Sequence, residues 1–283
     1  MAHNDIFDAS EKTAESGAGH YAPVNGLQLY YELHGTGEPL VLLHGGLGTI
    51  GMFAPLLPSL AASRQVIAVE LQACGHTADI DRPMAFEAMA DDIAALIEHL
   101  GLEKADILGY SMGGGVALQT AIRHPQRVRR LVVVSFPSAS HGWYPEIHQA
   151  MGTITAQVAA TWVGSPMHDA YAAVAPRPED WATMAAKTGR MVSQVYDWSE
   201  EVAALPTPTM LVVGDADSIP PGYAAEMFGL LGGGKQDGGW DGEGMSSARL
   251  AILPGTTHHN ILASPALLPA LLPFLNAPMA AVG

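Results

Sequence analysis

The stretch LGYSMGG, residues 108–114, organises the rest of the chain. An apolar run typical of a β-strand precedes it at residues 105–108, and a run typical of a helix follows it at residues 116–122. A strand, a G-x-S-x-G turn and a helix form the pattern known as a nucleophile elbow. The turn is so tight that the positions two before and two after the serine crowd together, which glycine permits because it has no Cβ. We therefore predict that the Ser111 hydroxyl is exposed above the sheet edge, beside the N–H groups that begin the next helix.

Composition limits the classes of protein to which the chain can belong. It has 283 residues, 48% of them hydrophobic and 14% charged, which allows one large α/β domain or two small ones. Its net charge of −15 argues against nucleic acid and anionic membranes as partners, because both attract Lys and Arg. Cys74 is the single cysteine, so no intrachain disulfide or cysteine-based metal site is possible. Residues 1–20 are polar and acidic, which predicts a flexible arm rather than a signal peptide.

Apolar strand-like runs alternate with helix-like segments along most of the chain. The strand-like runs lie at residues 27–33, 39–43, 65–70, 105–108, 130–134, 209–213 and 250–253, and the helix-like segments at 53–62, 86–100, 116–122, 224–231 and 266–275. Most of these strands are apolar throughout, as expected for strands buried on both faces of a parallel sheet. The alternation predicts an α/β fold with a doubly wound, mostly parallel, eight-stranded sheet.

The alternation stops between residues 137 and 205, where helix-like segments are rich in tryptophan and methionine. We interpret these residues as a helical lid inserted into a core that consists of residues 21–136 and 206–283. A glycine-rich loop, residues 232–247, is expected to be flexible.

A serine nucleophile needs a base to accept its proton and an acid to orient that base. In this type of sheet the acid and then the histidine follow later strands. Asp215 and Asp217 follow one such strand, and His258 and His259 follow the next. We favour Asp217, because three residues past Gly214 leave room to aim a carboxylate. We favour His258 because it suits the length of the loop. The alternative is a glycine-rich turn with an inert serine, turn-capping aspartates and surface histidines.

The oxyanion of an acyl-transfer reaction needs two backbone N–H donors. One comes from the residue after the nucleophile, here Met112, and the other from the loop after an earlier strand. The loop HGGLG at residues 44–48 fits, with Gly46 the first candidate and Leu47 the second. His44 is expected to bond the loop backbone.

A competing motif overlaps this loop. Residues 46–51 satisfy G-x-G-x-x-G, and Glu70 ends the next strand, which resembles a dinucleotide-binding fingerprint. We disfavour this interpretation because it leaves Ser111, Asp217 and His258 without a role. The pair Asp215-x-Asp217 lacks further ligands, so no metal site is expected.

Aromatic and sulfur-containing side chains near the predicted site are candidates for an apolar substrate pocket. They are Trp143, Trp162, Met151, Tyr110 and His259.

Four motifs together resemble the α/β-hydrolase superfamily: HGGLG at 44–48, GYSMGG at 109–114, GDAD at 214–217 and PGTTH at 254–258. The resemblance implies a lidded bacterial esterase, a cofactor-free perhydrolase or a C–C bond hydrolase. Relatives often carry Asp-x-Arg-Gly-His-Gly after the fourth strand, whereas this chain has ELQACGHT at residues 70–77 without the arginine. A serine nucleophile also argues against epoxide hydrolases and haloalkane dehalogenases.

The sequence thus predicts a cytoplasmic serine hydrolase that cleaves a small, mostly apolar ester or lactone without cofactor or metal. No segment is apolar for long enough to cross a membrane. We expect a monomer or homodimer that binds neither nucleic acid nor membranes. The alternatives are C–C bond hydrolysis, perhydrolysis, or a small-molecule receptor on a hydrolase fold.

Overall fold

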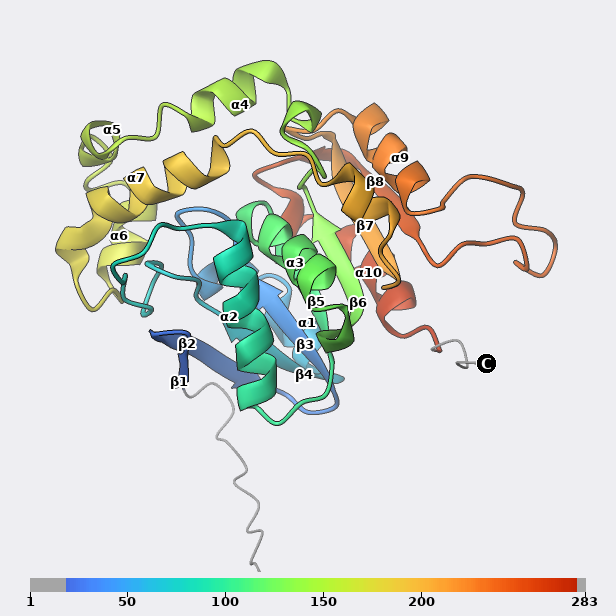
Figure 1. Ribbon diagram of the computed structural model, residues 1–283, viewed down its shortest axis with the longest axis horizontal. Helices are drawn as coiled ribbons and strands as arrows, with labels where there is room; N and C mark the ends of the chain where they lie inside the picture. The colour runs from blue at the N-terminus through green and yellow to red at the C-terminus, as the bar shows by residue number, and fades with distance from the viewer. Residues whose placement is uncertain (1–18, 279–283) are drawn as a thin grey trace, which may run out of the picture.

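The computed structural model describes residues 19–278, in which eight strands form one sheet (Figure 1). Their spatial order is β1-β2-β4-β3-β5-β6-β7-β8, and all neighbours from β4 to β8 are parallel. Only the pairs β1–β2 and β2–β4 are antiparallel. The strands are β1 Gly19–Val24, β2 Leu27–His34, β3 Glu38–Leu43, β4 Arg64–Val69, β5 Ala105–Tyr110, β6 Val128–Val134, β7 Thr209–Ala216 and β8 Arg249–Thr257. The predicted eight-stranded, mostly parallel sheet is therefore confirmed.

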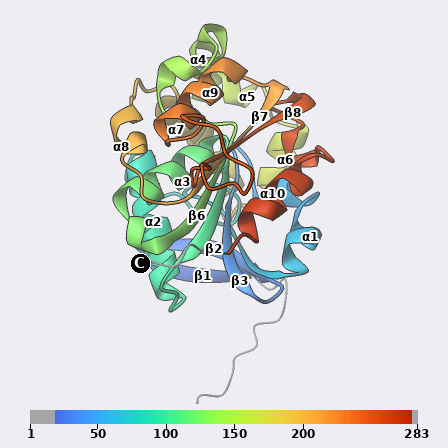
Figure 2. The same ribbon diagram turned by 90° about the vertical axis from the view of Figure 1, so that its right-hand side faces the viewer.

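Helices cover both faces of the sheet, which explains why its strands are apolar throughout. Alternate residues of a strand point to opposite faces. In β3, Leu40 and Leu42 pack with α1 (Leu57–Ala61) and α10 (Leu267–Leu275). Val41 and Leu43 belong to the second cluster, with residues of the remaining core helices. These helices are α2 (Phe86–His99), α3 (Met112–Arg123) and α9 (Pro221–Leu230). Figure 2 shows α1 and α10 on one side of the sheet and α2 and α3 on the other.

Two predicted elements differ from the structure for identifiable reasons. The helix predicted over residues 53–62 is a 3₁₀ turn, η1 (Ile50–Phe53), followed by the short helix α1. Pro55 and Pro58 lack the N–H groups that a continuous helix would need. Strand β1 was not predicted, because a glycine and Pro23 obscure its pattern. Pro23 is tolerated because β1 lies at the edge of the sheet.

The predicted N-terminal arm, residues 1–20, lies outside the described residues except for Gly19 and His20, which begin β1. A hairpin joins β1 to β2 through Asn25 and Gly26, whose φ angles are 46° and 86°. This dipeptide is the preferred sequence of a two-residue hairpin turn. The Asn-Gly pair was therefore a local signal for the missed strand.

Helices connect β6 to β7 and lie over the carboxyl ends of the parallel strands (Figure 1). We call residues 137–205 the helical segment. The structure describes all of this segment, and its β-type pairing is limited to one isolated bridge between Ala139 and Asp197. Its helices are α4 Pro145–Met151, α5 Ala156–Ala160, α6 Pro166–Ala172, α7 Trp181–Val192 and α8 Ser199–Ala203, with the 3₁₀ turns η3 Ser140–Gly142 and η4 Pro178–Asp180.

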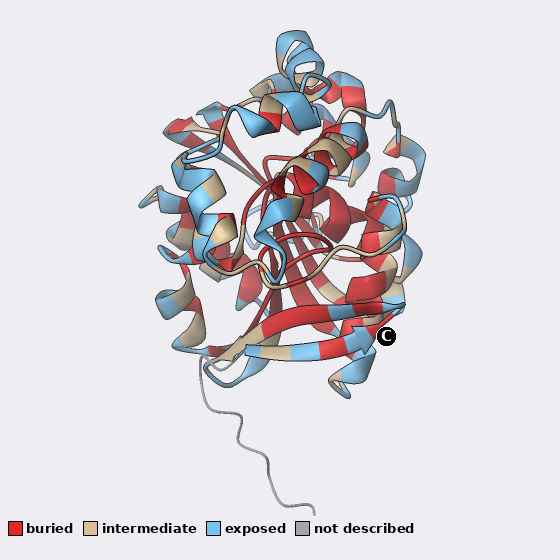
Figure 3. Ribbon diagram, turned by 90° about the vertical axis from the view of Figure 1, so that its left-hand side faces the viewer, coloured by how far each residue is buried: buried red, intermediate tan, exposed pale blue. Residues whose placement is uncertain are grey.

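Burial is concentrated in the sheet and on the inward faces of the helices (Figure 3). The loop at residues 232–247 lies between α9 and β8, and its Trp240 is fully exposed. Among residues 19–278, no helix combines the length and apolar character that a membrane crossing requires.

Candidate active site

The elbow around Ser111 has the backbone conformation that its sequence predicts. Ser111 has φ 51° and ψ −122°, a conformation that is rare for residues with a side chain. A Cβ on Gly109 would lie 2.0 Å from the carbonyl oxygen of Gly113. A Cβ on Gly113 would lie 2.2 Å from the carbonyl oxygen of Leu43. Glycine is thus required at both positions, and the turn places Ser111 between β5 and the start of α3.

Three side chains from the carboxyl ends of different strands meet at this turn. His258, which follows β8, has its Nε2 atom 3.0 Å from Ser111 Oγ. Its Nδ1 atom lies 2.9 Å from Oδ1 of Asp217, which follows β7. The structure therefore joins Ser111, His258 and Asp217 in one chain of hydrogen bonds, in the order that the sequence predicts.

The Asp217 carboxylate is buried and accepts several hydrogen bonds. Its Oδ2 accepts bonds from Ser135 Oγ at 2.5 Å and from the Gly214 N–H at 2.9 Å. Burial pushes the pKa of Asp217 upward. The hydrogen bonds and the charge of His258 outweigh this effect, so the net pKa lies below its usual value. Asp217 is therefore held as a carboxylate. Ser135, which directly follows β6, was not predicted as part of the site, and no sequence signal identified it.

The two alternative residues have different surroundings. Asp215 is exposed and accepts hydrogen bonds from the N–H groups of Gly255 at 3.0 Å and Thr256 at 3.1 Å. These bonds lower the pKa of Asp215 and connect the last residues of β7 to β8, where the pairing of the two strands is irregular. His259 is exposed as well. Asp215 thus stabilises the pairing of β7 with β8, rather than a turn.

Tyr110 holds the backbone of His258 in place. Its hydroxyl donates a 2.7 Å hydrogen bond to the backbone carbonyl of His258. Burial, with a smaller contribution from the charge of Asp217, raises the pKa of Tyr110 to about 12. The hydroxyl therefore remains a donor at neutral pH. The Trp143 ring lies edge-on to the imidazole of His258, with ring centroids 5.8 Å apart.

The loop after β3 provides backbone N–H groups beside Ser111. Gly46, Leu47 and Met112 line the same cavity as Ser111. Within residues 19–278, the N–H groups of these three residues find no hydrogen-bond acceptor. All three predicted oxyanion-hole residues therefore lie beside Ser111, and among the described residues their N–H groups have no hydrogen-bond partner.

His44 holds this loop in place. Its Nδ1 atom bonds the carbonyl oxygen of Gly45 at 2.8 Å, and its Nε2 atom accepts the N–H of Leu71 at 3.2 Å. Burial lowers the pKa of His44, which keeps the ring neutral. The expected bond to the loop backbone is confirmed.

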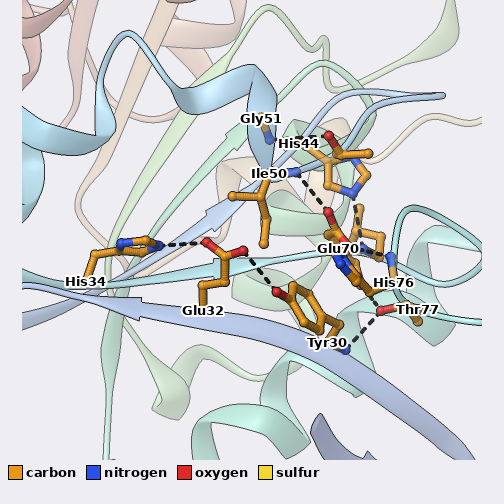
Figure 4. Close-up of polar contacts among 11 residues, drawn as sticks. Tyr30, Glu32, His34, His44, Ile50, Gly51, Glu70, His76 and Thr77 are labelled. Atoms are coloured by element: carbon orange, nitrogen blue, oxygen red, sulfur yellow. Dashed lines mark hydrogen bonds and ion pairs between the residues drawn. The ribbon is translucent and has the colours of Figure 1, made fainter. Parts of the chain in front are cut away.

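The loop that lacks the usual arginine is held by Glu70 (Figure 4). One carboxylate oxygen of Glu70 accepts bonds from the His76 N–H at 2.5 Å and from His76 Nδ1 at 2.8 Å. The other oxygen accepts the Ile50 N–H at 3.4 Å. The His76 ring also stacks on Tyr30, with centroids 4.0 Å apart. Glu70 is buried and bonded in this way, so its carboxylate is not free to bind the ribose of a dinucleotide. This argues against the dinucleotide-binding interpretation, which needs an acidic residue at that position.

A small apolar cavity of about 140 Å³ opens beside Ser111. Trp143 and Met151 line it as predicted, whereas Trp162, Tyr110 and His259 do not. Trp162 instead packs, half-buried, against the hydrophobic core. Four lining residues were not predicted: Phe136, Ile154, Thr188 and Val192. Thr188 and Val192 are four residues apart and so share one helix face, but this spacing does not tell which way the face is turned. A larger hollow of about 660 Å³ beside α10 contains none of the three hydrogen-bonded residues.

Comparisons with known proteins agree with this architecture. A model of the α/β hydrolase fold matches residues 38–163. The chain is 26% identical to a protein assigned as the carbamate hydrolase RutD of Azorhizobium caulinodans, over 84% of this chain and 91% of that protein. It is 29% identical to 2-hydroxymuconate semialdehyde hydrolase of Pseudomonas sp. strain CF600, over 66% and 73% of the two chains.

A solved thermophilic esterase from Thermogutta terrifontis has the same fold, with a TM-score of 0.68 and 23% identity over 92% of this chain and 98% of that chain. The chain has the fold of the α/β-hydrolase superfamily. It is a hydrolase built on this fold.

Proposed function

We propose that the protein is a serine hydrolase that cleaves a small, mostly apolar carboxylic ester or lactone through an acyl-enzyme. Ser111 Oγ attacks the carbonyl carbon while His258 Nε2 takes its proton. His258 then returns this proton to the leaving alcohol, and a water molecule activated by the same imidazole hydrolyses the acyl-enzyme. Asp217 remains ionised, holds the imidazole tautomer and offsets its positive charge.

The tetrahedral intermediate places a negative charge on the former carbonyl oxygen. In this proposal the N–H groups of Met112 and Gly46 stabilise that charge, with Leu47 as a further donor. Removing one such donor typically costs about 10²–10³ in rate. The 140 Å³ cavity with its apolar lining suits a short acyl group, and the helical segment acts as a lid that excludes bulk water from it.

The observation that carries the proposal is the hydrogen-bonded chain from Ser111 through His258 to Asp217, which begins at an apolar cavity. The test uses p-nitrophenyl esters of increasing acyl length. We expect Ser111→Ala and His258→Ala to lose about 10⁴–10⁶-fold in kcat. His259→Ala is the matched control and should retain activity, because His259 is exposed and neighbours the same turn. Ester hydrolysis that survives in Ser111→Ala would exclude the proposal.

The similarity to 2-hydroxymuconate semialdehyde hydrolase favours a second candidate, hydrolysis of a carbon–carbon bond in a ring-cleavage product. The same serine, histidine and oxyanion donors would serve that reaction. Turnover of a vinylogous diketone at a higher kcat/KM than any p-nitrophenyl ester would favour this candidate. Complete labelling of Ser111 by a fluorophosphonate, without repeated turnover of any substrate, would instead indicate a receptor.

A further inference from the structure

A single lysine connects the helical segment to the core beside the cavity. Lys187 lies on α7, and its Nζ atom donates to the Asp79 carboxylate, to the carbonyl oxygen of Ile80 at 3.1 Å and to that of Arg82 at 3.0 Å. An ammonium group has three N–H donors, so all of them are used. The side chains of Lys187 and Asp79 are only 16% and 12% exposed. This arrangement is a nearly buried ion pair reinforced by two bonds to backbone carbonyls.

The core side of this contact is itself held in place. Gln72, which is buried, donates from Nε2 to Asp79 Oδ1 at 2.9 Å and accepts from Arg82 Nε at 2.7 Å. The Arg82 guanidinium also pairs with Asp92 on α2. Residues 79–82 are therefore attached to the core, and Lys187 binds α7 to an anchored loop rather than to a free one.

The residues next to Lys187 on α7 form one wall of the cavity. Thr188 and Val192 line it directly. A Cβ on Gly46 would lie 3.3 Å from the Thr188 methyl group, so α7 also lies against the loop that carries the predicted oxyanion donors. A Cβ on the adjacent Gly189 would lie 2.2 Å from the carbonyl oxygen of Ile154, another cavity residue, so α7 packs closely against this segment too. A small movement of α7 would therefore change the size of the cavity and the contact with Gly46.

We propose that Lys187 is a positioning residue that fixes α7 over Ser111 and thereby sets the largest acyl group that the cavity accepts. The expected effect on acyl-length selectivity rests on the proposed ester hydrolysis, whereas the expected effect on the position of α7 does not. Lys187 does not line the cavity, and its hydrogen bonds go to Asp79, Ile80 and Arg82, none of which belongs to the Ser111–His258–Asp217 chain. It acts through the helix that carries Thr188 and Val192.

The test compares Lys187→Met with Arg190→Met. Arg190 is an exposed cation on the same helix and forms no ion pair within the part of the chain that the structure describes. Breaking a nearly buried pair leaves the Asp79 charge uncompensated, so we expect Lys187→Met to loosen α7. Amide exchange in residues 184–192 should become faster by about tenfold or more, because local opening is eased there. Arg190→Met should exchange like the unmodified protein.

The kinetic readout separates positioning from general destabilisation. For p-nitrophenyl acetate, Lys187→Met should raise KM about tenfold with kcat within about twofold, the result expected when contacts made equally in the ground state and the transition state are lost. The ratio of kcat/KM for octanoate to that for acetate should rise at least about fivefold, since the wall no longer limits acyl length. Asp79→Asn should shift both quantities in the same direction, and Lys187→Arg should retain part of the original profile.

Each other outcome has a defined meaning. A Lys187→Met protein that melts at lower temperature but keeps the acyl-length profile and the α7 exchange rates of the unmodified protein would overturn the proposal. If the unmodified protein hydrolyses no ester, the proposed function fails, whereas unchanged α7 exchange in Lys187→Met would still overturn the positioning role. The two failures are therefore distinguishable.

Discussion

Replacing Tyr110 with phenylalanine tests whether the backbone below His258 must be held for the site to work. The substitution removes one oxygen atom and leaves the ring in place. The hydroxyl donates a 2.7 Å hydrogen bond to the His258 carbonyl, and both partners are at least partly buried. The carbonyl would lose its donor while its surroundings stay the same.

The magnitude follows from the cost of an unpaired carbonyl. Such a loss amounts to about 1–2 kcal/mol when the acceptor stays largely desolvated. If all of this energy is needed in the transition state, kcat/KM falls by about 5–30-fold, since 1.36 kcal/mol corresponds to a factor of ten. The effect should appear mainly in kcat, because the altered residue positions the base and does not line the substrate cavity.

The assay measures kcat and KM on a short p-nitrophenyl ester, together with urea unfolding. Tyr171→Phe is the matched control, because the hydroxyl of Tyr171 also donates to a backbone carbonyl, that of Arg177, at 3.3 Å. Both variants should lose unfolding free energy, but only Tyr110→Phe should lose activity. A Tyr110→Phe protein with kcat/KM within twofold of the original would refute the reasoning.

Two further predictions concern the elbow and the pH dependence of stability. Gly109→Ala should lower the free energy of unfolding by more than about 4 kcal/mol and prevent folding, because the added Cβ would lie 2.0 Å from the carbonyl oxygen of Gly113. Gly222→Ala is the control. Its Cβ would have no heavy atom within 4 Å, so the melting temperature should stay nearly unchanged. Folding lowers the pKa of Asp217, so the ionised carboxylate stabilises the folded state. This stabilisation is complete at pH values above 3.8, the ordinary pKa of an aspartate, and it is lost as the pH falls through the lower pKa of the folded protein. Urea unfolding between about pH 5 and pH 2 should therefore show a smaller loss of stability in Asp217→Asn than in the original protein; equal slopes would contradict the prediction.

Much of the fold could be predicted because its signals are local. A parallel strand buried on both faces must be apolar throughout, so the runs that became β3 and β6 were recognisable without any knowledge of their neighbours. The elbow is similar, since the crowding at Ser111 is relieved by glycines two residues away. The missed strand β1 had a local signal too, in the Asn25–Gly26 turn.

The helix around Pro55 and the pocket were harder to predict for a different reason. The helical periodicity of residues 53–62 conflicts with two prolines, and in the folded chain the prolines prevail. The cavity wall depends on which face of α7 is turned toward Ser111, and that orientation results from packing and from the contact of Lys187 with a loop 105 to 108 residues away. No spacing within α7 encodes that distant loop.

The sequence by itself determined the sheet, the nucleophile elbow and the strand ends from which Asp217 and His258 come, because each depends on short-range sterics and on strand burial. Only the tertiary structure decided that Tyr110 supports His258 rather than lining a pocket, that Ser135 bonds Asp217, and that Thr188 and Val192 close the cavity. These contacts join residues far apart in the chain, and their geometry exists only once the helical segment has packed on the core.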